Sequence, residues 1–214
     1  MSRKNRATEF LRSHYTHRFT KYGATADGVD WGSSAKHRVR LHNMVLHAGV
    51  DAMAGQSLLD VGCGYGELLA VLEDDFGVRP SNYVGIDPCL PMVEAARQRH
   101  PRYHFEAIPF EEFVPSQSVD RLFCCGVFTK KVNVNEVEMY ALLDAFFAFA
   151  KNAEVRSVTF NTMSPLCDIR PDDLFFPDAG KIFSLMQDYW SYSVRKYVVS
   201  NDYLQYEMLV HIEL

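Results

Sequence analysis

The sequence contains no long hydrophobic run. None of its apolar stretches approaches the roughly 20 residues that a helix needs to cross a lipid bilayer. It also shows no charged segment followed by an apolar run and a small-residue cleavage site, which is the pattern of a secretory signal. We therefore expect a cytoplasmic protein without a membrane span.

Paired cysteines are missing as well. The five cysteines are an odd number and contain no C-x-x-C pair, so we expect no structural disulfide. Cys124 and Cys125 lie in an apolar run. We expect them to be small core residues rather than nucleophiles, because a reactive thiol needs exposed, electropositive surroundings.

A metal-binding pattern is absent too. His37, His42 and His47 are spaced by five residues, which places successive rings about 140° apart around a helix. Three such rings cannot converge on one ion. We predict no metal site.

The chain has no excess of positive charge. Its 22 Lys and Arg residues are outnumbered by 27 Asp and Glu, for a net charge of -5. Proteins that hold nucleic acid through phosphate contacts need a concentrated basic surface, so we expect a small or neutral partner instead. One N-terminal segment is basic and contains a single acidic residue, Glu9; its cations are Arg3, Lys4, Arg6, Arg12, Arg18 and Lys21. That segment is a solvated helix face, a contact for an anionic partner or a transit peptide.

Strand-like and helix-like segments alternate along most of the 214 residues. Apolar runs predict strands at 57–61, 83–87, 103–107, 119–125 and 155–161, and helical spacing predicts helices at 67–76, 92–99 and 135–150. Such repeats form a parallel sheet covered by helices on both faces. Two further strands at 194–200 and 205–213 predict an antiparallel hairpin.

Two helices are expected before this alternation begins. Residues 7–22 carry apolar side chains at steps of three or four, which predicts an amphipathic helix that packs as a lid or cap. Ser33 or Ser34 can cap a second helix that ends near Gly49.

The most informative run follows the first strand. An apolar segment ends at Asp60, turns through Gly62, Gly64 and Gly66, and enters a helix at Glu67. Without side chains at these glycines, the backbone can come close to a nucleoside-type ligand. A dinucleotide fingerprint would need its third glycine at position 67, where Glu67 stands. The spacing therefore disfavours a nicotinamide oxidoreductase.

A second acidic residue, Asp87, ends the next strand. A carboxylate there either accepts the two ribose hydroxyls of a nucleoside cofactor or caps the following helix. The order of the segments favours the first interpretation: the glycine turn, Asp87, the helix opened by Pro91, residues 106–108 and residues 125–128 follow one another at successive strand ends. These ends would converge on one cofactor.

This ordered set, with the hairpin tail, resembles the class I S-adenosylmethionine-dependent methyltransferases across nearly the whole chain. The resemblance implies a Rossmann-like, doubly wound α/β fold: a seven-stranded, mostly parallel sheet with an antiparallel C-terminal strand and helices on both faces. It also implies one domain over residues 1–214, with a helical cap at 1–50 and a catalytic core at 51–214.

The resemblance assigns cofactor contacts position by position. The residues implied to line the methionine and ribose part of S-adenosylmethionine are Asp60, Gly62, Cys63, Gly64 and Gly66. Asp87 would hold the ribose hydroxyls. Ala107 and Ile108, with Glu106 beside them, would flank the adenine, and Cys125 would offer mainly its backbone under the sulfonium.

The segment at 22–31, YGATADGVDW, looks like a loop found in a subgroup of these enzymes, many of which have no assigned acceptor. In related members an arginine on the following helix pairs with the cofactor carboxylate, and Arg40 is the best match. Alternatively, Arg40 is one of several solvent-facing basic residues. Trp31 either covers the cofactor or fills the junction. Lys130, after the fourth strand, makes that loop more basic than in the subgroup.

Methyl transfer requires an acceptor lone pair held in line with the methyl carbon and the exclusion of water, while a general base is optional. The residues that could serve as a base are His14, His17, Asp168, Tyr203 and Tyr206, and spacing selects none of them, so no catalytic residue is assigned. We expect residues 161–164 at the rim of the acceptor site.

The predicted function is methyl transfer to an oxygen or nitrogen atom of a small molecule. The alternative is a sensor or scaffold protein that binds S-adenosylmethionine without catalysis. A nucleic-acid methyltransferase is disfavoured because the Asn-Pro-Pro-Tyr motif is absent. The aromatic stretches at 174–176 and 183–192 form either a homodimer face or a core helix.

Overall fold

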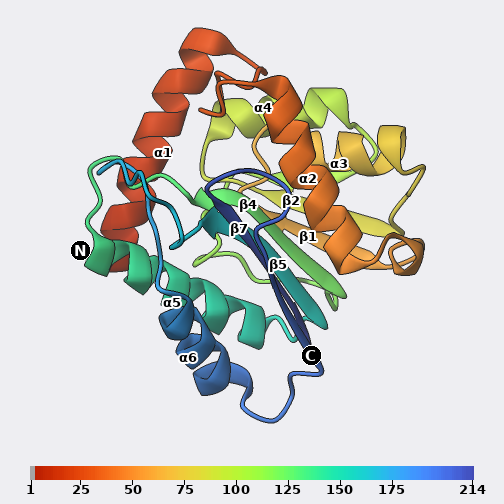
Figure 1. The fold of residues 1–214 in the computed structure, drawn as a ribbon. Helices are drawn as coiled ribbons and strands as arrows, with labels where there is room; N and C mark the ends of the chain where they lie inside the picture. The colour runs from red at the N-terminus through yellow and green to blue at the C-terminus, as the bar shows by residue number, and fades with distance from the viewer. Residues whose placement is uncertain (1–2) are drawn as a thin grey trace.

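A seven-stranded sheet forms the centre of the protein (Figure 1), as described for residues 3–214 by a computed structural model. The strands lie in the order β3-β2-β1-β4-β5-β7-β6. The parallel strands are β1 (Ser57–Val61), β2 (Asn82–Ile86), β3 (His104–Glu106), β4 (Arg121–Phe128) and β5 (Ser157–Met163). β7 (Glu207–Glu213) runs antiparallel to both β5 and β6 (Lys196–Ser200), so the predicted antiparallel tail is confirmed.

Helices cover both faces of the sheet, as the sequence predicts. One face carries α2 (Ser34–Ala48), α3 (Glu67–Ala70, continued by a π-helical turn at Val71–Asp75) and α4 (Leu90–Arg99). The other face carries α5 (Glu136–Asn152) and α6 (Ala179–Trp190). A short 3-10 turn at Val50–Ala52 leads from α2 toward β1.

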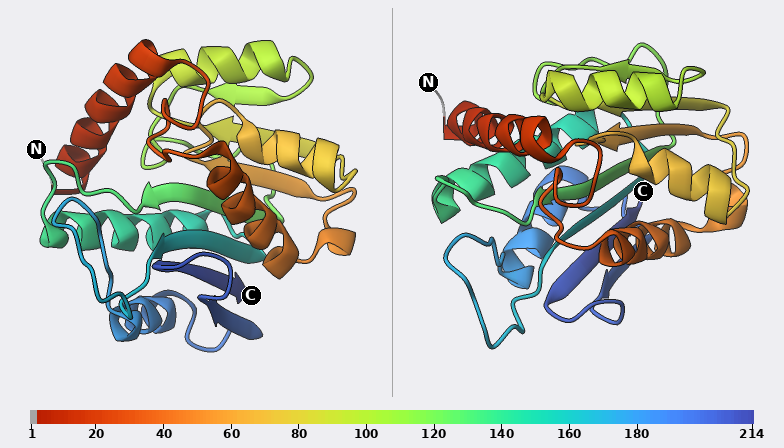
Figure 2. Two further views of the ribbon diagram at one scale, coloured as in Figure 1. Left: turned by 45° about the horizontal axis from the view of Figure 1, so that its top comes forward. Right: turned by 90° about the horizontal axis from the view of Figure 1, so that it is seen from above.

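The helix α1 (Arg3–Tyr22) lies beside the carboxyl ends of the parallel strands, next to α5 and α4 (Figure 2). Its apolar residues Ala7 and Leu11 join the core between the sheet and α5, and Phe19 packs against Met92 of α4. The side chains of Arg3 and Lys4, from the predicted basic segment, lie outside the described residues.

Two hydrophobic clusters separated by the sheet form the core. Along β4, Leu122 and Cys124 point into the cluster under α5 and α6, while Phe123 points into the cluster under α2, α3 and α4. All three side chains are fully buried, as expected for a central parallel strand. Cys124 is thus a core residue, as predicted, whereas Cys125 is only half-buried and lines the cavity at the end of the strands.

The boundaries of some elements differ from the predicted ones. β4 runs to Phe128 because its pairing with β5 continues past Cys124, through an irregularity, to Phe128 opposite Thr162, whereas its pairing with β1 ends at Cys124. β3 is shorter than predicted because it is an edge strand that pairs only with β2.

The helix α6 explains the aromatic stretch at 183–192. Asp178 caps its first turn by accepting a hydrogen bond from the Lys181 amide, and Ile182, Met186 and Trp190 are buried in the core. The inner side of α6 therefore packs into the core, while Phe183 on its outer side remains 43% exposed. None of the helices within residues 3–214 is long and apolar enough to cross a membrane.

Candidate cofactor site

The turn after β1 requires glycine at two positions. Gly62 has φ +73°, and a Cβ there would lie 2.5 Å from Cγ2 of Val127. Gly66 has φ +82°, and a Cβ there would lie 2.8 Å from Cδ2 of His100. Both residues occupy the left-handed region, which side chains disfavour. The Nε2 atom of His100 lies 3.0 Å from the Gly66 carbonyl oxygen, a hydrogen bond that holds the end of the turn.

Asp87, at the end of β2, connects the glycine turn to α4. Its carboxylate accepts hydrogen bonds from the backbone amides of Gly64 (3.1 Å) and Cys89 (2.8 Å). Cys89 is the N-cap residue of α4, so Asp87 also supports the start of that helix, as the alternative interpretation predicted. Burial raises the pKa of Asp87 to about 6, and the two amides act in the opposite direction. A carboxylate has about four acceptor positions, so capacity remains for further donors.

Asp60 is the second buried carboxylate of the site. It is 2% exposed and accepts a 2.6 Å hydrogen bond from the Tyr83 hydroxyl. Burial raises the pKa of Asp60 to about 7, with a further contribution from nearby Asp87.

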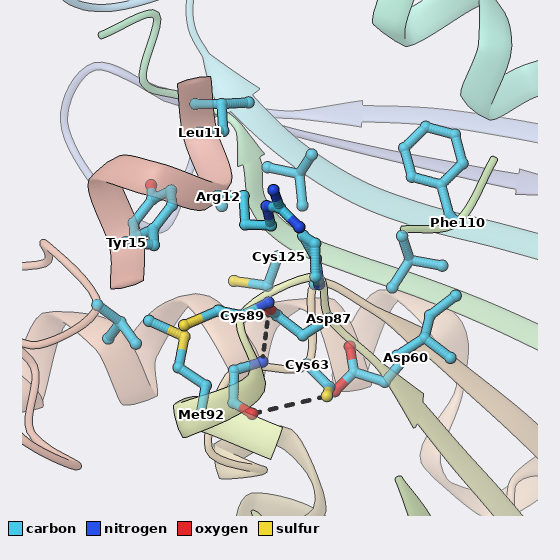
Figure 3. A pocket seen from close by; sticks show the side chains of 18 of the residues that line it. Leu11, Arg12, Tyr15, Asp60, Cys63, Asp87, Cys89, Met92, Phe110 and Cys125 are labelled. Carbon is cyan, nitrogen blue, oxygen red and sulfur yellow. Dashed lines mark hydrogen bonds between the residues drawn. The ribbon is translucent and has the colours of Figure 1, made fainter. Parts of the chain in front are cut away.

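These groups line one cavity at the carboxyl ends of the strands (Figure 3). The ends of β1, β2 and β4 and the loop after β3 all contribute to its wall, as the predicted convergence requires. Eight of the predicted cofactor residues line it: Trp31, Asp60, Gly62, Cys63, Gly64, Asp87, Ile108 and Cys125. Gly66, Ala107 and Arg40 are not part of the lining; Gly66 starts α3 behind the turn, and Ala107 faces solvent.

Arg40 lies behind Trp31. Its guanidinium carbon is 3.8 Å from the centroid of the Trp31 ring, and its Nε is 2.7 and 2.8 Å from the two carboxylate oxygens of Glu207. Arg40 is only 7% exposed, so the alternative in which it faces solvent is wrong. Its pairing with a cofactor carboxylate stays a prediction.

Comparison with known proteins gives the family. A family model described as "Methyltransferase domain" matches residues 59–146. A curated protein of Mycobacterium tuberculosis (strain ATCC 25618 / H37Rv), "Putative methyltransferase Rv1506c", is 30% identical over 167 residues, which cover 75% of this chain and 95% of that protein. The chain belongs to the class I S-adenosylmethionine-dependent methyltransferase family.

Solved structures share the fold of this methyltransferase. Magnesium protoporphyrin IX methyltransferase from Synechocystis PCC 6803, crystallised with S-adenosylmethionine, has a TM-score of 0.66 at 15% identity over 100% of this chain and 97% of that one. The 1,6-didemethyltoxoflavin-N1-methyltransferase of Burkholderia thailandensis, crystallised with 1,6-didemethyltoxoflavin and S-adenosylhomocysteine, has a TM-score of 0.62 at 15% identity over 100% and 91%. The cofactor of the family is S-adenosylmethionine.

The cavity of this methyltransferase fits that cofactor. A buried carboxylate with remaining acceptor capacity suits a ribose diol, and a turn without Cβ atoms allows close approach. Ile108 and Phe110 form an apolar wall that suits a purine ring. The contact of each individual residue with the cofactor stays a prediction.

The helix α1 completes the cavity. Thr8, Leu11, Arg12 and Tyr15 belong to the lining, so the N-terminal helix covers the site, as expected for a lid. The sequence indicated the apolar stripe that contains Leu11 and Tyr15, but not its contact with a cofactor site. Burial, with the charges of Asp30 and Asp87, raises the pKa of Tyr15 and keeps its phenol protonated.

Asp30 holds the covering segments together. Its carboxylate lies 3.0 Å from His14 Nε2, 3.2 Å from Arg18 Nη2 and 3.4 Å from Lys130 Nζ. Lys130 also pairs with Asp173 at 2.9 Å. Lys130, the unusual basic residue after β4, therefore joins an ion-pair cluster between α1 and three loops, those of Asp30, Lys130 and Asp173.

The predicted bases lie outside the cavity lining. His14 is paired with Asp30, His17 and Asp168 are exposed, and the Tyr203 hydroxyl lies 3.4 Å from Glu207. Tyr206 is half-buried and is also absent from the lining.

The predicted rim at 161–164 is buried at the end of β5, where Asn161 accepts a 2.7 Å hydrogen bond from the Gly126 amide. Among residues 3–214, no three His, Cys, Asp or Glu side chains gather as a metal site.

The raised pKa of Asp87 predicts a pH dependence of cofactor binding. Because the folded protein holds this proton up to about pH 6, the free site carries a neutral carboxyl at pH 5, and the proton must leave before the carboxylate can accept ribose hydroxyls. We expect the affinity for S-adenosylhomocysteine to be about tenfold lower at pH 5 than at pH 8. Calorimetry over this range checks it. The variant Asp87→Asn should lose this dependence; an unchanged profile in that variant would assign the titration to another group.

Proposed function

We propose that this methyltransferase transfers the methyl group of S-adenosylmethionine to an oxygen or nitrogen atom of a small molecule. The observation that carries the proposal is the roof of the cavity. Leu11 and Tyr15 of α1 line the same cavity as Val127 at the end of β4. An acceptor enclosed between them would have to be small, and the apolar walls would exclude water.

The charge distribution supports a small acceptor over a nucleic acid. Arg12, which lines the cavity, is paired with Glu9, and Arg18 and Lys130 are paired with Asp30. These cations do not form a free basic surface. The toxoflavin-type methyltransferase of the same fold binds a small acceptor, which agrees with this proposal.

In the proposed mechanism the cofactor would supply a methyl group on a sulfonium sulfur: the acceptor lone pair would bond to the methyl carbon as the carbon–sulfur bond breaks, and the thioether S-adenosylhomocysteine would leave without being protonated. The residues of this chain would hold the cofactor and orient the acceptor. Asp87 would accept the ribose hydroxyls, the turn from Gly62 to Gly64 would approach the methionine part, and α1 would close over the acceptor. Tyr15 would act as a hydrogen-bond donor, since its raised pKa makes it unsuited to be a base.

Two measurements test the proposal. Calorimetry should show binding of S-adenosylhomocysteine by the full chain and none of NADH at micromolar concentration. Labelled methyl groups from S-adenosylmethionine should then enter low-molecular-mass compounds of a cell extract. Binding without any transfer would favour the sensor or scaffold alternative, and label in RNA or protein would overturn the small acceptor.

We also propose a single domain over residues 1–214, with a cap at 1–50 and a core at 51–214. It is supported by the packing of α1 and α2 on the same two clusters that hold the sheet. A cytoplasmic location is supported by five free cysteines, which suit a reducing compartment. A homodimer and the subgroup with the YGATADGVDW segment stay predictions.

A further inference from the structure

The first turn of α2 places an unassigned imidazole in the cavity wall. His37 lines the cavity although it is only 7% exposed. Burial lowers its pKa to about 4, so the ring is neutral at physiological pH. Its contacts are with rings: the centroid of Trp31 lies 5.7 Å away in a stacked arrangement, and that of Tyr65 lies 6.4 Å away edge-on.

The ring of His37 makes no hydrogen bond or ion pair within residues 3–214. Its nitrogens are not among the fully buried atoms that lack a partner, so they remain accessible from the cavity that His37 lines. A neutral imidazole carries one N–H donor and one acceptor, and both need a partner from the protein, from water or from a ligand. Because His37 belongs to the cavity lining, a ligand in the cavity could supply the missing partner.

The position of His37 indicates which part of the cofactor it would meet. Tyr65 belongs to the glycine turn, the end of the cavity that suits the methionine part, whereas Ile108 and Phe110 form the adenine end. The helix α2 begins at Ser34, and its N-terminus carries a partial positive charge. A carboxylate is therefore the favoured group beside His37.

Arg40, one turn further along α2, is less suited to this contact. Its Nε and Nη2 are bound by Glu207, and Trp31 covers the guanidinium. Its Nη1 is buried without a partner among the described residues, but Arg40 is not part of the cavity lining. Trp31 packs on both His37 and Arg40, but only His37 shares the cavity with it. The donor that reaches the cavity from α2 is thus the histidine.

We propose that His37 is a cofactor-binding residue that donates a hydrogen bond from its imidazole to the carboxylate of the amino-acid part of S-adenosylmethionine. The inference rests on the proposed function, since it requires that cofactor in the cavity. In this proposal α2 recognises the carboxylate of the cofactor through His37, whereas Asp87 recognises the ribose.

Truncated ligands test this contact in the full chain. Calorimetry compares S-adenosylhomocysteine with 5′-methylthioadenosine, which lacks the amino-acid part, and with decarboxylated S-adenosylmethionine, which is S-adenosylmethionine without its carboxylate. In His37→Ala we expect about tenfold weaker binding of S-adenosylhomocysteine, as for loss of a hydrogen bond to a charged group. Binding of the two compounds without the carboxylate should stay within about twofold of wild type.

Matched variants separate the contact from packing. His37→Phe keeps a ring against Trp31 but no donor, and should lose affinity as His37→Ala does. His42→Ala changes a histidine of the same helix that pairs with Asp75 outside the cavity, and should bind all three ligands like wild type. Equal losses for all three ligands, or unchanged S-adenosylhomocysteine binding in His37→Ala, would overturn the proposal. Failure of the wild-type protein to bind S-adenosylhomocysteine would instead reject the proposed function.

Discussion

Replacing Asp87 by alanine is expected to weaken binding of S-adenosylmethionine by at least tenfold, about 1.4 kcal/mol or more. The carboxylate is 9% exposed, so its hydrogen bonds to ribose hydroxyls would be little screened by solvent. The substitution also removes the acceptor of the Gly64 and Cys89 amides, which loosens the glycine turn itself. Calorimetry with S-adenosylhomocysteine measures the loss.

Two variants give this experiment its controls. Asp87→Asn keeps one oxygen acceptor and should show a smaller loss than alanine. Asp27→Ala removes an exposed carboxylate on the loop before α2 and should leave the affinity unchanged. Wild-type affinity in Asp87→Ala would show that the cavity does not hold the ribose at this position.

Gly62→Ala is expected to lower both stability and cofactor affinity. An alanine at φ +73° costs about 1–2 kcal/mol, and its Cβ would lie 2.5 Å from Cγ2 of Val127, a β-branched side chain with little rotamer freedom. Relief of this contact must move the turn or the end of β4, and both line the cavity. We expect at least about tenfold weaker binding in calorimetry, because misplaced backbone loses several contacts together.

Gly55→Ala is the matched control for Gly62→Ala. Gly55 has φ +79°, but a Cβ there would meet nothing within 4 Å. It should therefore show the conformational cost alone, about 1–2 kcal/mol in chemical unfolding, with wild-type affinity. Adding Val127→Ala to Gly62→Ala should restore part of the stability. Equal behaviour of Gly55→Ala and Gly62→Ala would show that the contact with Val127 is unimportant.

Local patterns explain which parts of this protein could be predicted from the sequence. The β1 strand, the glycine turn and Asp87 depend on short-range requirements of backbone geometry and burial, and the structure has them at the predicted positions. The cap of α2 is equally local: Ser33 accepts a hydrogen bond from the Lys36 amide.

Features that depend on distant segments were harder to predict. Arg40 finds its partner Glu207 on the last strand, 167 residues away, so its burial was not visible from its basic neighbours. The spacing of His37, His42 and His47 excluded a shared metal but carried no information on His37 alone, whose role depends on Trp31 and the cavity. The element boundaries that differed from the prediction were those of strands, because the pairing partners of a strand decide its length, as in β4.

The ion pairs of Asp30 have a consequence for turnover. One carboxylate joins α1, the loop before α2 and the loop after β4, and Lys130 extends the connection to Asp173. Because α1 covers the cavity, a movement of α1 that opened it would have to separate these ion pairs. Salt screens ion pairs near the surface. We therefore expect α1 to open faster at high than at low ionic strength, so that the rate of S-adenosylhomocysteine release rises with salt concentration.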